Sequence, residues 1–568
     1  MNATRFNFIR LIILILFALA LFKAYRIAIV EHNYYLKRYT KRIIRTVTKQ
    51  GRRGAIFGGR GSAFALDYPV YTLFVDPVYF KNDIAYRVRH GHPEYPERVK
   101  RFIDKLARIL GVNAAVIDRM IDEHPSSHYV VISKRISQAT YKKIVNADMP
   151  PSFGFIRRFK RYYPDGEYSA HNIGFCFSNS HGAEGLERYY DRFLMGRRIS
   201  DSVALDAFKG LPLPPLKPGY DLHISLIKGI QDYVHMELAK TVKEHDAKSG
   251  TVIVMDPYTG AIIAMDSYPF YDNNHYSRYP YSDIRNRAVA DVFEPGSVFK
   301  LITMSAALDS GKFKGNEIVY CENGRWKLGR RIIHDVHRFG WLSFRNVFVY
   351  SSNIGSAKIA LKLGKKIFYR YLYLYGFGSR TGIDTISEAK GLLKDIMGIG
   401  RIDLATMAFG QGIGVTEIQL AVAYSVIANG GYRVRPHFME WLSLDGKRSL
   451  SWKVQKVRIL KPSTVRIIRS ILTDVVKRGT GKRAALKDYV VAGKTGTAQI
   501  PKHGSYNTRQ YVASFAGFAP ANRPRLVVVV SIFNPEKGGF YGGVVAAPLF
   551  AKIMEYSLHY LGVPPASR

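Results

Sequence analysis

The segment Glu294-Pro-Gly-Ser-Val-Phe-Lys300 marks the start of an apolar helix. Pro-Gly interrupts the preceding structure, and apolar residues then recur at helical spacing up to Asp309-Ser-Gly311, where a glycine can end a helix. Ser297 is therefore expected in the first turn, with Lys300 one turn later on the same face. A lysine of lowered pKa can take a proton from a serine hydroxyl, and the N–H groups of a helix N-terminus favour an oxyanion. The pair is a candidate centre for acyl transfer.

Ser-x-x-Lys also occurs at Ser225–Lys228 and at Ser387–Lys390, so the pair alone is weak evidence. Ser225 has no Pro-Gly turn before it and is expected within an ordinary amphipathic helix over 225–247. Evidence from elsewhere in the chain is needed to decide which of the three pairs is catalytic.

Composition indicates a globular protein with an anionic partner. The chain has 568 residues, 47% hydrophobic and 23% charged residues, and a net charge of +40. This length suggests two to four domains. No segment resembles a zinc finger, a ribonucleoprotein aromatic motif or a Walker loop, and the basic residues are spread along the chain. We therefore expect an anionic envelope surface, not nucleic acid, as the partner.

The N-terminus contains an apolar stretch, Leu11–Phe22, within a span from about Phe8 to Val30 that is long enough to cross a bilayer. A cleaved signal peptide is the alternative, because Ala18-Leu-Ala20 resembles a cleavage site. We expect an uncleaved anchor over residues 1–30, and both interpretations export the remainder. The residues after the span are more basic than those before it, so charge does not by itself fix the orientation.

The segment from Glu31 to Gln50 is basic and dotted with aromatic residues. We expect it to continue the helix out of the membrane. Its charges would meet lipid headgroups or a membrane partner, or form a solvated helix face; the sequence leaves these alternatives open.

A proline-rich stretch, Leu211–Gly219, is the best domain boundary. The predicted organisation is an anchor over 1–30, a first domain over 31–210, a linker over 211–222 and a second domain over 223–568. In the first domain, 70–75 is predicted as a strand, and 96–110 and 113–123 as helices.

The second domain is predicted to be α+β. Residues 251–256 and 261–266 form a hairpin pattern, a largely helical stretch runs from Ser297 to Asn429, and 431–452 is predicted as a hairpin insertion. The later elements are helices over 462–477 and 546–561 and strands over 494–499, 511–518 and 526–533. Strands on both sides of a helical insert imply one sheet that joins distant segments.

Two cysteines and one histidine are further candidates for functional groups. Cys176 and Cys321 lie in different predicted segments, and we expect two separate thiols, although a disulfide stays open. His171 has no second ligand at suitable spacing, so we expect a structural histidine.

Three short motifs stand in one order: Ser297-x-x-Lys300, Ser351-x-Asn353 and Lys494-Thr495-Gly496. Taken singly, the second could be a helix cap and the third an exposed strand end. A further Ser-x-Asn, Ser505–Asn507, comes after the Lys-Thr-Gly and so breaks the order. The ordered set is strong evidence where each part is weak.

With its flanking residues, this set resembles the penicillin-binding proteins, and specifically the monofunctional class B transpeptidases. The resemblance covers nearly the whole chain, and its main residues are Phe293-Glu-Pro-Gly-Ser-Val-Phe-Lys300, Tyr350-Ser-Ser-Asn-Ile-Gly355, Phe409-Gly-Gln-Gly412 and Gly493-Lys-Thr-Gly-Thr-Ala-Gln499. Arg285-Asn-Arg-Ala-Val289 looks more like the septal, FtsI-type branch than the elongation branch. One segment departs from the family, because Gly58 and Gly59 replace an Asp-Arg pair and put the anchoring contacts there in doubt.

The resemblance implies an α+β transpeptidase domain, with an antiparallel sheet flanked by helices, on a mixed α/β pedestal of the dimerisation type. It also implies a single transmembrane helix in the cytoplasmic membrane, with the catalytic domain on the extracytoplasmic, periplasmic side.

The resemblance also assigns roles. Ser297 attacks the penultimate D-alanine of a donor stem pentapeptide, Lys300 takes its proton, and Ser351 passes a proton to the leaving D-alanine. Asn353 orients Lys300 and the donor, and Lys494 brings positive charge near the substrate carboxylate and can keep Lys300 neutral. Thr495, Gly496 and Thr497 bind the substrate: the two threonine hydroxyls hold its carboxylate, and the N–H groups of Ser297 and Thr497 form the oxyanion hole. An acceptor stem peptide then releases the acyl group. No metal or organic cofactor is implied.

Several other functions would use the same motifs or be compatible with them. A serine D,D-carboxypeptidase or β-lactamase of the same superfamily would use the same motifs but release the acyl group to water. A β-lactam sensor would need an output module, and a bifunctional enzyme a glycosyltransferase signature; neither is found. The implied partners are stem peptides, β-lactams bound covalently at Ser297, an FtsW-type membrane glycosyltransferase and other cell-division proteins. Contact with the glycosyltransferase is expected at the anchor and at Lys37–Arg53.

Overall fold

The computed structural model describes residues 3–32, 34, 44–196, 198–204, 217–500 and 510–565. The chain divides into two compact units: Met1–Arg52 with Met195–Gly219, and Arg53–Leu194 with Tyr220–Arg568. The proline-rich stretch lies largely outside the described residues, as do Ser505–Asn507 and most of the basic segment after the anchor.

The first unit contains the predicted membrane helix. Helix α1 (Ala3–Tyr25) continues into a π-helical stretch, η1 (Arg26–Val30). Within the described residues, Asn7–Val30 is the one helix long and apolar enough to cross a membrane, with a mean hydropathy of 2.3.

We expected the helix to continue to Gln50, and this is wrong for residues 44–50, which form a strand. Strand β1 (Ile44–Gln50) pairs antiparallel with β6 (Arg198–Ala204), from Ile44 opposite Ala204 to Gln50 opposite Arg198. Pairing with a segment about 150 residues away overrides the local helical preference of the basic run.

A seven-stranded sheet in the second unit joins segments from far apart in the sequence, in the order β16-β15-β7-β2-β3-β4, with β5 also paired to β3. Its strands are β2 (Ile56–Phe57), β3 (Ala63–Val75), β4 (Val130–Ile136), β5 (Phe153–Tyr162), β7 (Asp221–Ile224), β15 (Met439–Leu444) and β16 (Lys447–Ser451). The predicted strand over 70–75 is confirmed as the end of β3. The predicted hairpin over 431–452 exists as β15–β16, but it is not an isolated insertion because β15 also pairs with β7.

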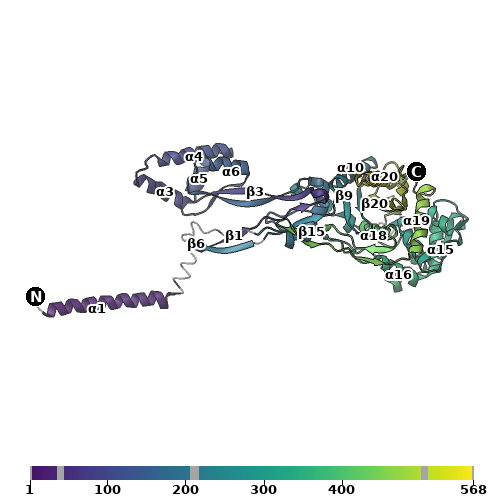
Figure 1. The fold of residues 1–568 in the computed structure, drawn as a ribbon, viewed down its shortest axis with the longest axis horizontal. Coiled ribbons are helices and arrows are strands. Elements are labelled where there is room, and N and C mark those ends of the chain that lie inside the picture. The colour runs from purple at the N-terminus through teal and green to yellow at the C-terminus, as the bar shows by residue number, and fades with distance from the viewer. Residues whose placement is uncertain are drawn as a thin grey trace. The chain divides into compact units, whose positions relative to one another are not determined.

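Helices α3 (Pro77–Arg89), α4 (Tyr95–Leu110), α5 (Ala114–Asp122) and α6 (Gln138–Val145) lie beside β3 in Figure 1. The α4 helix is strongly amphipathic, and its apolar face packs with Leu73 and Val75 of β3 in one buried cluster. This confirms the helices expected over 96–110 and 113–123.

An antiparallel five-stranded sheet forms the centre of the second domain, in the order β18-β19-β20-β8-β9. Its strands are β18 (Ala492–Gln499), β19 (Tyr511–Ala519), β20 (Leu526–Phe533), β8 (Ser249–Met255) and β9 (Ile262–Tyr268). The predicted hairpin and the three later strands are therefore confirmed.

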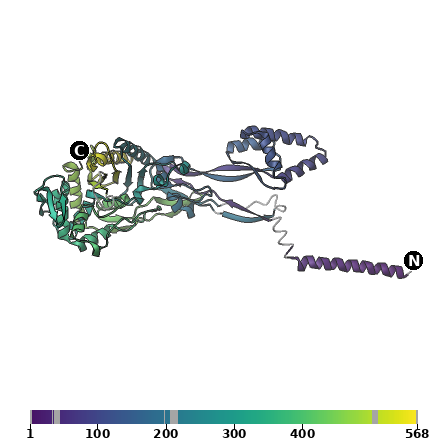
Figure 2. The same cartoon turned by 180° about the vertical axis from the view of Figure 1, so that it is seen from behind.

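Both faces of this sheet are covered. Val252 and Val254 of β8 pack in one cluster with α10 (Lys228–Glu244) and α20 (Gly542–Tyr560), whereas Ile253 and Met255 pack in another with α18 (Glu417–Ala428). This alternation follows the two-residue period of a strand. Figure 1 shows α10 and α20 on the opposite side of β20 from α18, and Figure 2 shows the same layers from behind. The α+β fold with an antiparallel sheet between helices is confirmed.

The helical stretch after Ser297 differs from the prediction in one place. It contains α13 (Lys300–Asp309), α14 (Phe344–Val349), α15 (Asn353–Leu363), α16 (Lys365–Tyr375) and α17 (Arg401–Met407), and α19 (Pro462–Lys477) follows with the bounds expected. Four short strands interrupt it: β10 (Ile318–Tyr320), β11 (Arg325–Leu328), β12 (Arg331–His334) and β13 (Trp341–Ser343). The smaller elements are β14 (Tyr432–Val434), β17 (Lys456–Arg458), α7 (Ala170–Ile173), α8 (Gly185–Tyr189), α9 (Asp191–Leu194), α11 (Tyr281–Ile284) and α12 (Arg287–Ala290).

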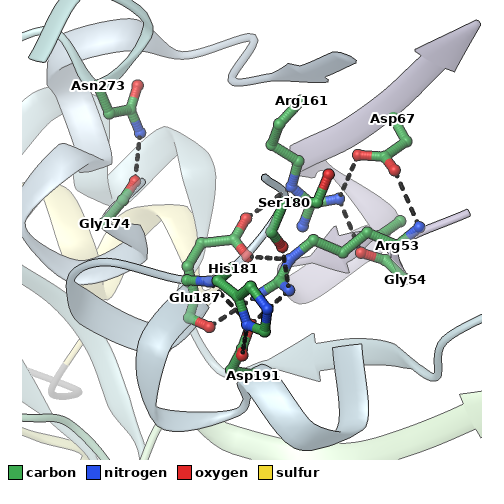
Figure 3. A network of polar contacts seen from close by, with 12 residues as sticks. Arg53, Gly54, Asp67, Arg161, Gly174, Ser180, His181, Glu187, Asp191 and Asn273 are labelled. Atoms are coloured by element: carbon green, nitrogen blue, oxygen red, sulfur yellow. Dashed lines mark hydrogen bonds and ion pairs between the residues drawn. The ribbon is translucent and has the colours of Figure 1, made fainter. Parts of the chain in front are cut away.

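The pedestal is held by a buried network of charges around Glu187 (Figure 3). Glu187 accepts from Arg53 at 2.7 Å and from Arg161 at 2.6 Å. Arg53 also pairs with Asp191 at 2.6 Å, and Arg161 with Asp67 at 3.2 Å. These contacts join β3, β5, α8 and α9 to the residue at which the second unit begins.

The charge network around Glu187 includes neither Gly58 nor Gly59. The replacement of the family's Asp-Arg pair by these two glycines therefore leaves the network intact. A Cβ at Gly58 would lie 2.2 Å from the buried ring of Phe64, so the turn has no room for a side chain there. Instead, Gly59 N donates to Leu226 O at 2.7 Å, and the Arg60 guanidinium lies 4.8 Å from the centre of the Tyr560 ring. The turn is tied to the second domain by its backbone and by one cation–π contact.

Candidate active site

Ser297 lies where the sequence places it. A 3-10 turn, η5 (Gly296–Phe299), leads directly into α13, so Ser297 and Lys300 are one turn apart at the start of one helical run. Gly296 has φ +59°, a conformation that favours glycine. Ser297 is half-buried and Lys300 is fully buried, with an exposed fraction of 0%.

Lys300 brings the first two motifs together. Its Nζ donates to the Ser351 carbonyl at 2.6 Å, to Ser351 Oγ at 3.1 Å and to Asn353 Oδ1 at 2.8 Å. Ser351 has φ +62°, a left-handed conformation that is uncommon for a non-glycine residue. Ser352, between the two, caps α15 by accepting from Gly355 N. The segment is thus both a helix cap and a contact of Lys300.

Lys494 adds the third motif. It lies in β18 with its side chain buried, and its Nζ donates to Ser351 Oγ at 2.9 Å. The same hydroxyl therefore meets both lysines. Lys494 also donates to the Thr495 carbonyl at 3.2 Å. The three motifs, separated by up to 197 residues in the sequence, converge on Ser351.

The strand that carries Lys494 runs past the serine turn. β18 is an edge strand of the five-stranded sheet, and a Cβ on Gly296 would lie 2.9 Å from the Thr497 carbonyl oxygen. A Cβ on Gly496 would lie 2.9 Å from the Pro295 carbonyl oxygen, so both glycines permit close approach. Thr497 Oγ1 accepts from Gly542 N at 3.0 Å. The edge offers backbone groups beside Ser297 to an extended ligand.

Burial determines the electrostatics of the two lysines. Burial lowers the pKa of Lys300 to about 7, against a smaller opposing effect of the Asp335 carboxylate. Burial also lowers the pKa of Lys494 well below its usual value, and the charge of Lys300 lowers it further. The repulsion between the two lysines is thus a secondary cause of the lowered pKa of Lys494. The lowered pKa of Lys300 is due to its burial, and not to Lys494 as expected. A neutral Lys300 near pH 7 can accept a proton from a serine hydroxyl.

Sequence reasoning missed two residues of this site. Asp335 follows β12 and accepts from Ser352 Oγ at 2.6 Å and from Asn353 N at 2.5 Å, which fixes the second motif. Thr480 Oγ1 lies 2.7 Å from Thr495 Oγ1 and accepts from Lys494 at 3.5 Å. No local pattern singles out either residue; only the fold brings them to the motifs.

The two other Ser-x-x-Lys pairs, here called the decoys, differ from Ser297–Lys300 in their surroundings. Ser225 lies before α10, not within it as expected, and its hydroxyl donates to the Ile262 carbonyl at 2.7 Å. Its partner Lys228 pairs with Asp165 at 2.6 Å. Ser387 and Lys390 are exposed. Neither decoy lysine is held in a buried, neutral environment.

The sequence predicts two separate thiols, Cys176 and Cys321, and a structural histidine, His171. Cys176 and Cys321 are free and buried, as predicted. The His171 imidazole lies 2.8 Å from the Asp283 carbonyl. Among the described residues, no group of three or more His, Cys, Asp or Glu side chains is arranged to hold a metal ion.

Comparison with known proteins identifies the class. The sequence model of the penicillin-binding protein transpeptidase domain matches residues 250–555, and that of the penicillin-binding protein dimerisation domain matches residues 48–211. The chain therefore belongs to the penicillin-binding protein transpeptidase family. The expected class, a class B penicillin-binding protein with serine-type D,D-transpeptidase chemistry, is confirmed.

Three relatives illustrate the match. The chain is 32% identical to "Probable peptidoglycan D,D-transpeptidase PenA" of Neisseria meningitidis, over 99% of this chain and 93% of the relative. It is 30% identical to "Peptidoglycan D,D-transpeptidase FtsI" of Escherichia coli K12, over 97% of this chain and 91% of the relative. A crystal structure of penicillin-binding protein 3 from Mycobacterium tuberculosis, complexed with aztreonam, is similar with a TM-score of 0.70 and 25% identity, covering 92% of this chain and 98% of that one.

Proposed function

We propose that this protein cross-links peptidoglycan stem peptides through an acyl-enzyme on Ser297. One observation carries the proposal: the buried Lys300, with its pKa lowered to about 7, contacts Ser351 and Asn353 and lies one helical turn from Ser297. A transpeptidase needs a base of this kind, because the serine hydroxyl is a poor nucleophile until its proton is removed.

The reaction proceeds in two balanced steps. Ser297 Oγ attacks the carbonyl carbon of the penultimate D-alanine as Lys300 takes its proton, the bond to the terminal D-alanine breaks, and Ser351 passes a proton to the leaving amine. The amine of an acceptor stem then attacks the ester carbonyl, so a new amide forms and Ser297 regains its proton. The N–H groups of Ser297 and Thr497 would hold the oxyanion in both steps.

Lys494, Thr495 and Thr497 are proposed to bind the terminal carboxylate of the donor. Burial favours neutral Lys494 in the free protein, and a bound carboxylate would raise its pKa again by its negative charge. Thr480 supports this group through Thr495. Asn353 is proposed to orient both Lys300 and the donor peptide. β-Lactams would acylate Ser297 because they present a carbonyl and a carboxylate to the same groups.

The test is the fate of the acyl group. The full chain is mixed with a synthetic stem pentapeptide and an amine acceptor, and the products are separated by mass spectrometry. We expect D-alanine to be released and the acceptor to be joined to the shortened stem. Hydrolysed stem alone would instead show a D,D-carboxypeptidase, and rapid turnover of penicillin would show a β-lactamase.

We further propose that the protein acts in septal synthesis during cell division, rather than in elongation. The support is the similarity to FtsI of Escherichia coli and the sequence Arg285-Asn-Arg-Ala-Val289. On this proposal the partners are an FtsW-type membrane glycosyltransferase and other division proteins. Cells depleted of the protein should form filaments, whereas rounded cells would favour the elongation branch.

The domain division and topology belong to the same proposal. Residues 1–30 would anchor the chain in the cytoplasmic membrane, 31–210 would form the pedestal, 211–222 the linker and 223–568 the transpeptidase domain on the periplasmic side. Protease treatment of intact spheroplasts should degrade the transpeptidase domain, and full protection of that domain would contradict this orientation.

A further inference from the structure

A groove of about 580 Å³ lies between α16 and the two-stranded ribbon of β14 and β17, on the outside of the second domain (Figure 1). Lys366, Arg370 and Tyr373 of α16 line one side, and Arg433 and Val457 of the ribbon line the other. The lining contains no residue of the three motifs. This groove, here called the α16 groove, is therefore separate from the candidate active site.

The groove side of α16 is a single stripe of the helix. Lys366, Arg370 and Tyr373 are exposed and follow one another at spacings of four and three residues, which places them on one face. The other face is buried against α13, where Tyr375 Oη lies 2.7 Å from Ser305 Oγ. Because packing on α13 holds the helix in place, the exposed stripe is already formed before a ligand arrives.

The ribbon presents a face to this stripe. Arg433 of β14 and Val457 of β17 are partners in the antiparallel register, so their side chains point to the same side of the ribbon. The Arg433 guanidinium donates to the Tyr373 carbonyl at 3.4 Å, which ties the ribbon to the last turn of α16. The two walls of the groove are thus joined to each other.

The charged residues that line the α16 groove are all cations: Lys366, Arg370 and Arg433. Among the described residues, none of the three forms an ion pair. Lys456 and Arg458, which flank Val457 in β17, are exposed and add further positive charge. The whole chain has a net charge of +40, so a second copy of it would be repelled. Charge complementarity therefore favours an acidic occupant.

The groove also exposes apolar surface. Tyr373 is 54% exposed and Val457 is 58% exposed, and Leu374 and the buried Ile459 extend the apolar lining. Aromatic and aliphatic groups gathered in this way are typical of protein interaction surfaces. A plain polyanion would leave these groups in water, whereas an acidic segment with one apolar face would cover them and meet the cations as well.

We propose that the α16 groove binds an acidic amphipathic helix of a partner protein. Apolar side chains of that helix pack on Tyr373 and Val457, and its carboxylates pair with Lys366, Arg370 and Arg433. α16 has 11 residues and is about 16 Å long, which matches about three turns of a bound helix. This docking surface takes no part in acyl transfer.

The test uses the full chain in detergent and three fluorescent peptides of about four helical turns each. The first has leucines on one face and glutamates elsewhere, the second has the same composition with the leucines scattered, and the third has lysines in place of the glutamates. Fluorescence anisotropy at constant ionic strength measures Kd. We expect the first peptide to bind about tenfold or more tightly than either of the others. Equal binding of the first two would overturn the amphipathic helix, and equal binding of the first and third would overturn the acidic partner.

Two matched double variants locate the binding site. Lys366→Glu with Arg370→Glu reverses two exposed charges of α16, and Lys142→Glu with Lys143→Glu reverses two exposed charges of α6. The α16 double should weaken binding of the first peptide about tenfold or more, and the α6 double should retain the wild-type Kd. Tyr373→Ala removes apolar surface and no charge, and should also weaken binding about tenfold. An equal Kd in the two doubles, or a wild-type Kd in Tyr373→Ala, would contradict the proposal.

A plain polyanion is the competing occupant, because it would meet the same cations. Short-chain polyphosphate is the probe for it, measured by its competition with the first peptide. We expect polyphosphate to bind the α16 and α6 doubles alike, because it responds to the net charge of the chain and not to the groove. Loss of polyphosphate binding in the α16 double alone, as large as the loss of peptide binding, would overturn the proposed protein partner.

Discussion

Buried cations occur in two regions of the second unit, and the two groups differ in their partners. Lys300 and Lys494 meet hydroxyl and carbonyl oxygens, and both have lowered pKa values. Arg53 and Arg161 share the carboxylate of Glu187; although burial alone would lower their pKa values, this pairing keeps them raised. Burial therefore does not decide the charge of a group by itself. Neutral partners make a buried cation a base, whereas carboxylate partners make it a structural ion.

The pKa of Glu187 supports the same reasoning from the acid side. Burial would raise its pKa, but Arg161 and Arg53 outweigh burial and hold the pKa below its usual value. Glu417 is the counterexample: it is fully buried, its closest partner is the Ser531 hydroxyl at 2.6 Å, and burial raises its pKa to about 8. Cationic partners thus lower the pKa of Glu187, whereas with a neutral hydroxyl partner burial raises the pKa of Glu417.

The largest effect is expected at Lys300. Lys300→Ala removes the proposed base and should slow acylation by penicillin about a thousandfold or more. The melting temperature should fall only modestly, because the Ser351 and Asn353 oxygens lose a hydrogen-bond donor but no buried charge loses an opposite charge. Stopped-flow fluorescence with a labelled penicillin measures the rate. Lys390→Ala, the lysine of the exposed decoy, is the control, and an equal loss in both variants would refute the assignment.

The next effect is expected at Glu187. Glu187→Gln leaves Arg53 and Arg161 buried without their shared carboxylate and should cost about 3–5 kcal/mol of unfolding free energy. Urea denaturation measures this, with Asp246→Asn in the exposed Lys537–Asp246 pair as a control expected to cost little. Folded Glu187→Gln protein should still be acylated by penicillin. An unchanged unfolding midpoint would show that the network does not hold the pedestal together.

A smaller effect is expected at Glu417. Because its folded pKa is raised to about 8 from a usual value of 4.5, its contribution to stability is complete below pH 4.5 and is lost as pH rises through 8. Wild type should lose about 2 kcal/mol between pH 6 and pH 8 relative to Glu417→Gln. Denaturation at the two pH values tests this, and Glu123→Gln, at an exposed position, should follow wild type. Parallel behaviour of Glu417→Gln and wild type would contradict the raised pKa.

The smallest effect is expected in the pH profile of acylation. Lys300 must be neutral to act as a base, so the rate should fall about tenfold for each pH unit well below 7. The Asp335 carboxylate raises the pKa of Lys300, so Asp335→Asn should move the midpoint of this profile to lower pH. The overall rate should also fall, because Asp335 holds Ser352 and Asn353. A midpoint shifted to higher pH would contradict the assigned sign.

Much of the fold and of the candidate site could be predicted from the sequence, because these parts depend on local sequence signals. Pro295-Gly296 sets the turn before α13, and the continuous apolar runs of β8 and β20 are typical of strands buried on both faces. The order of the three motifs predicts their convergence, and the contacts at Ser351 agree with it.

The rest of the fold and of the site depends on contacts between residues that lie far apart in the sequence. β2, β7 and β15 pair although they lie near residues 56, 222 and 442, and β1 is a strand only through its pairing with β6. Asp335 and Thr480 reach the motifs from loops, and the roles of Lys300 and Glu187 depend on burial. None of these features has a periodic or compositional signature in the chain.

The most direct test of the account is the intact mass of the full chain after reaction with penicillin, followed by mapping of the modified peptide. We predict the addition of one penicillin to the peptide that contains Ser297, with no adduct in Ser297→Ala and an unchanged adduct in Ser225→Ala and Ser387→Ala. An adduct that persists in Ser297→Ala, or one that maps to Ser351, would contradict the assignment of Ser297 as the acyl carrier.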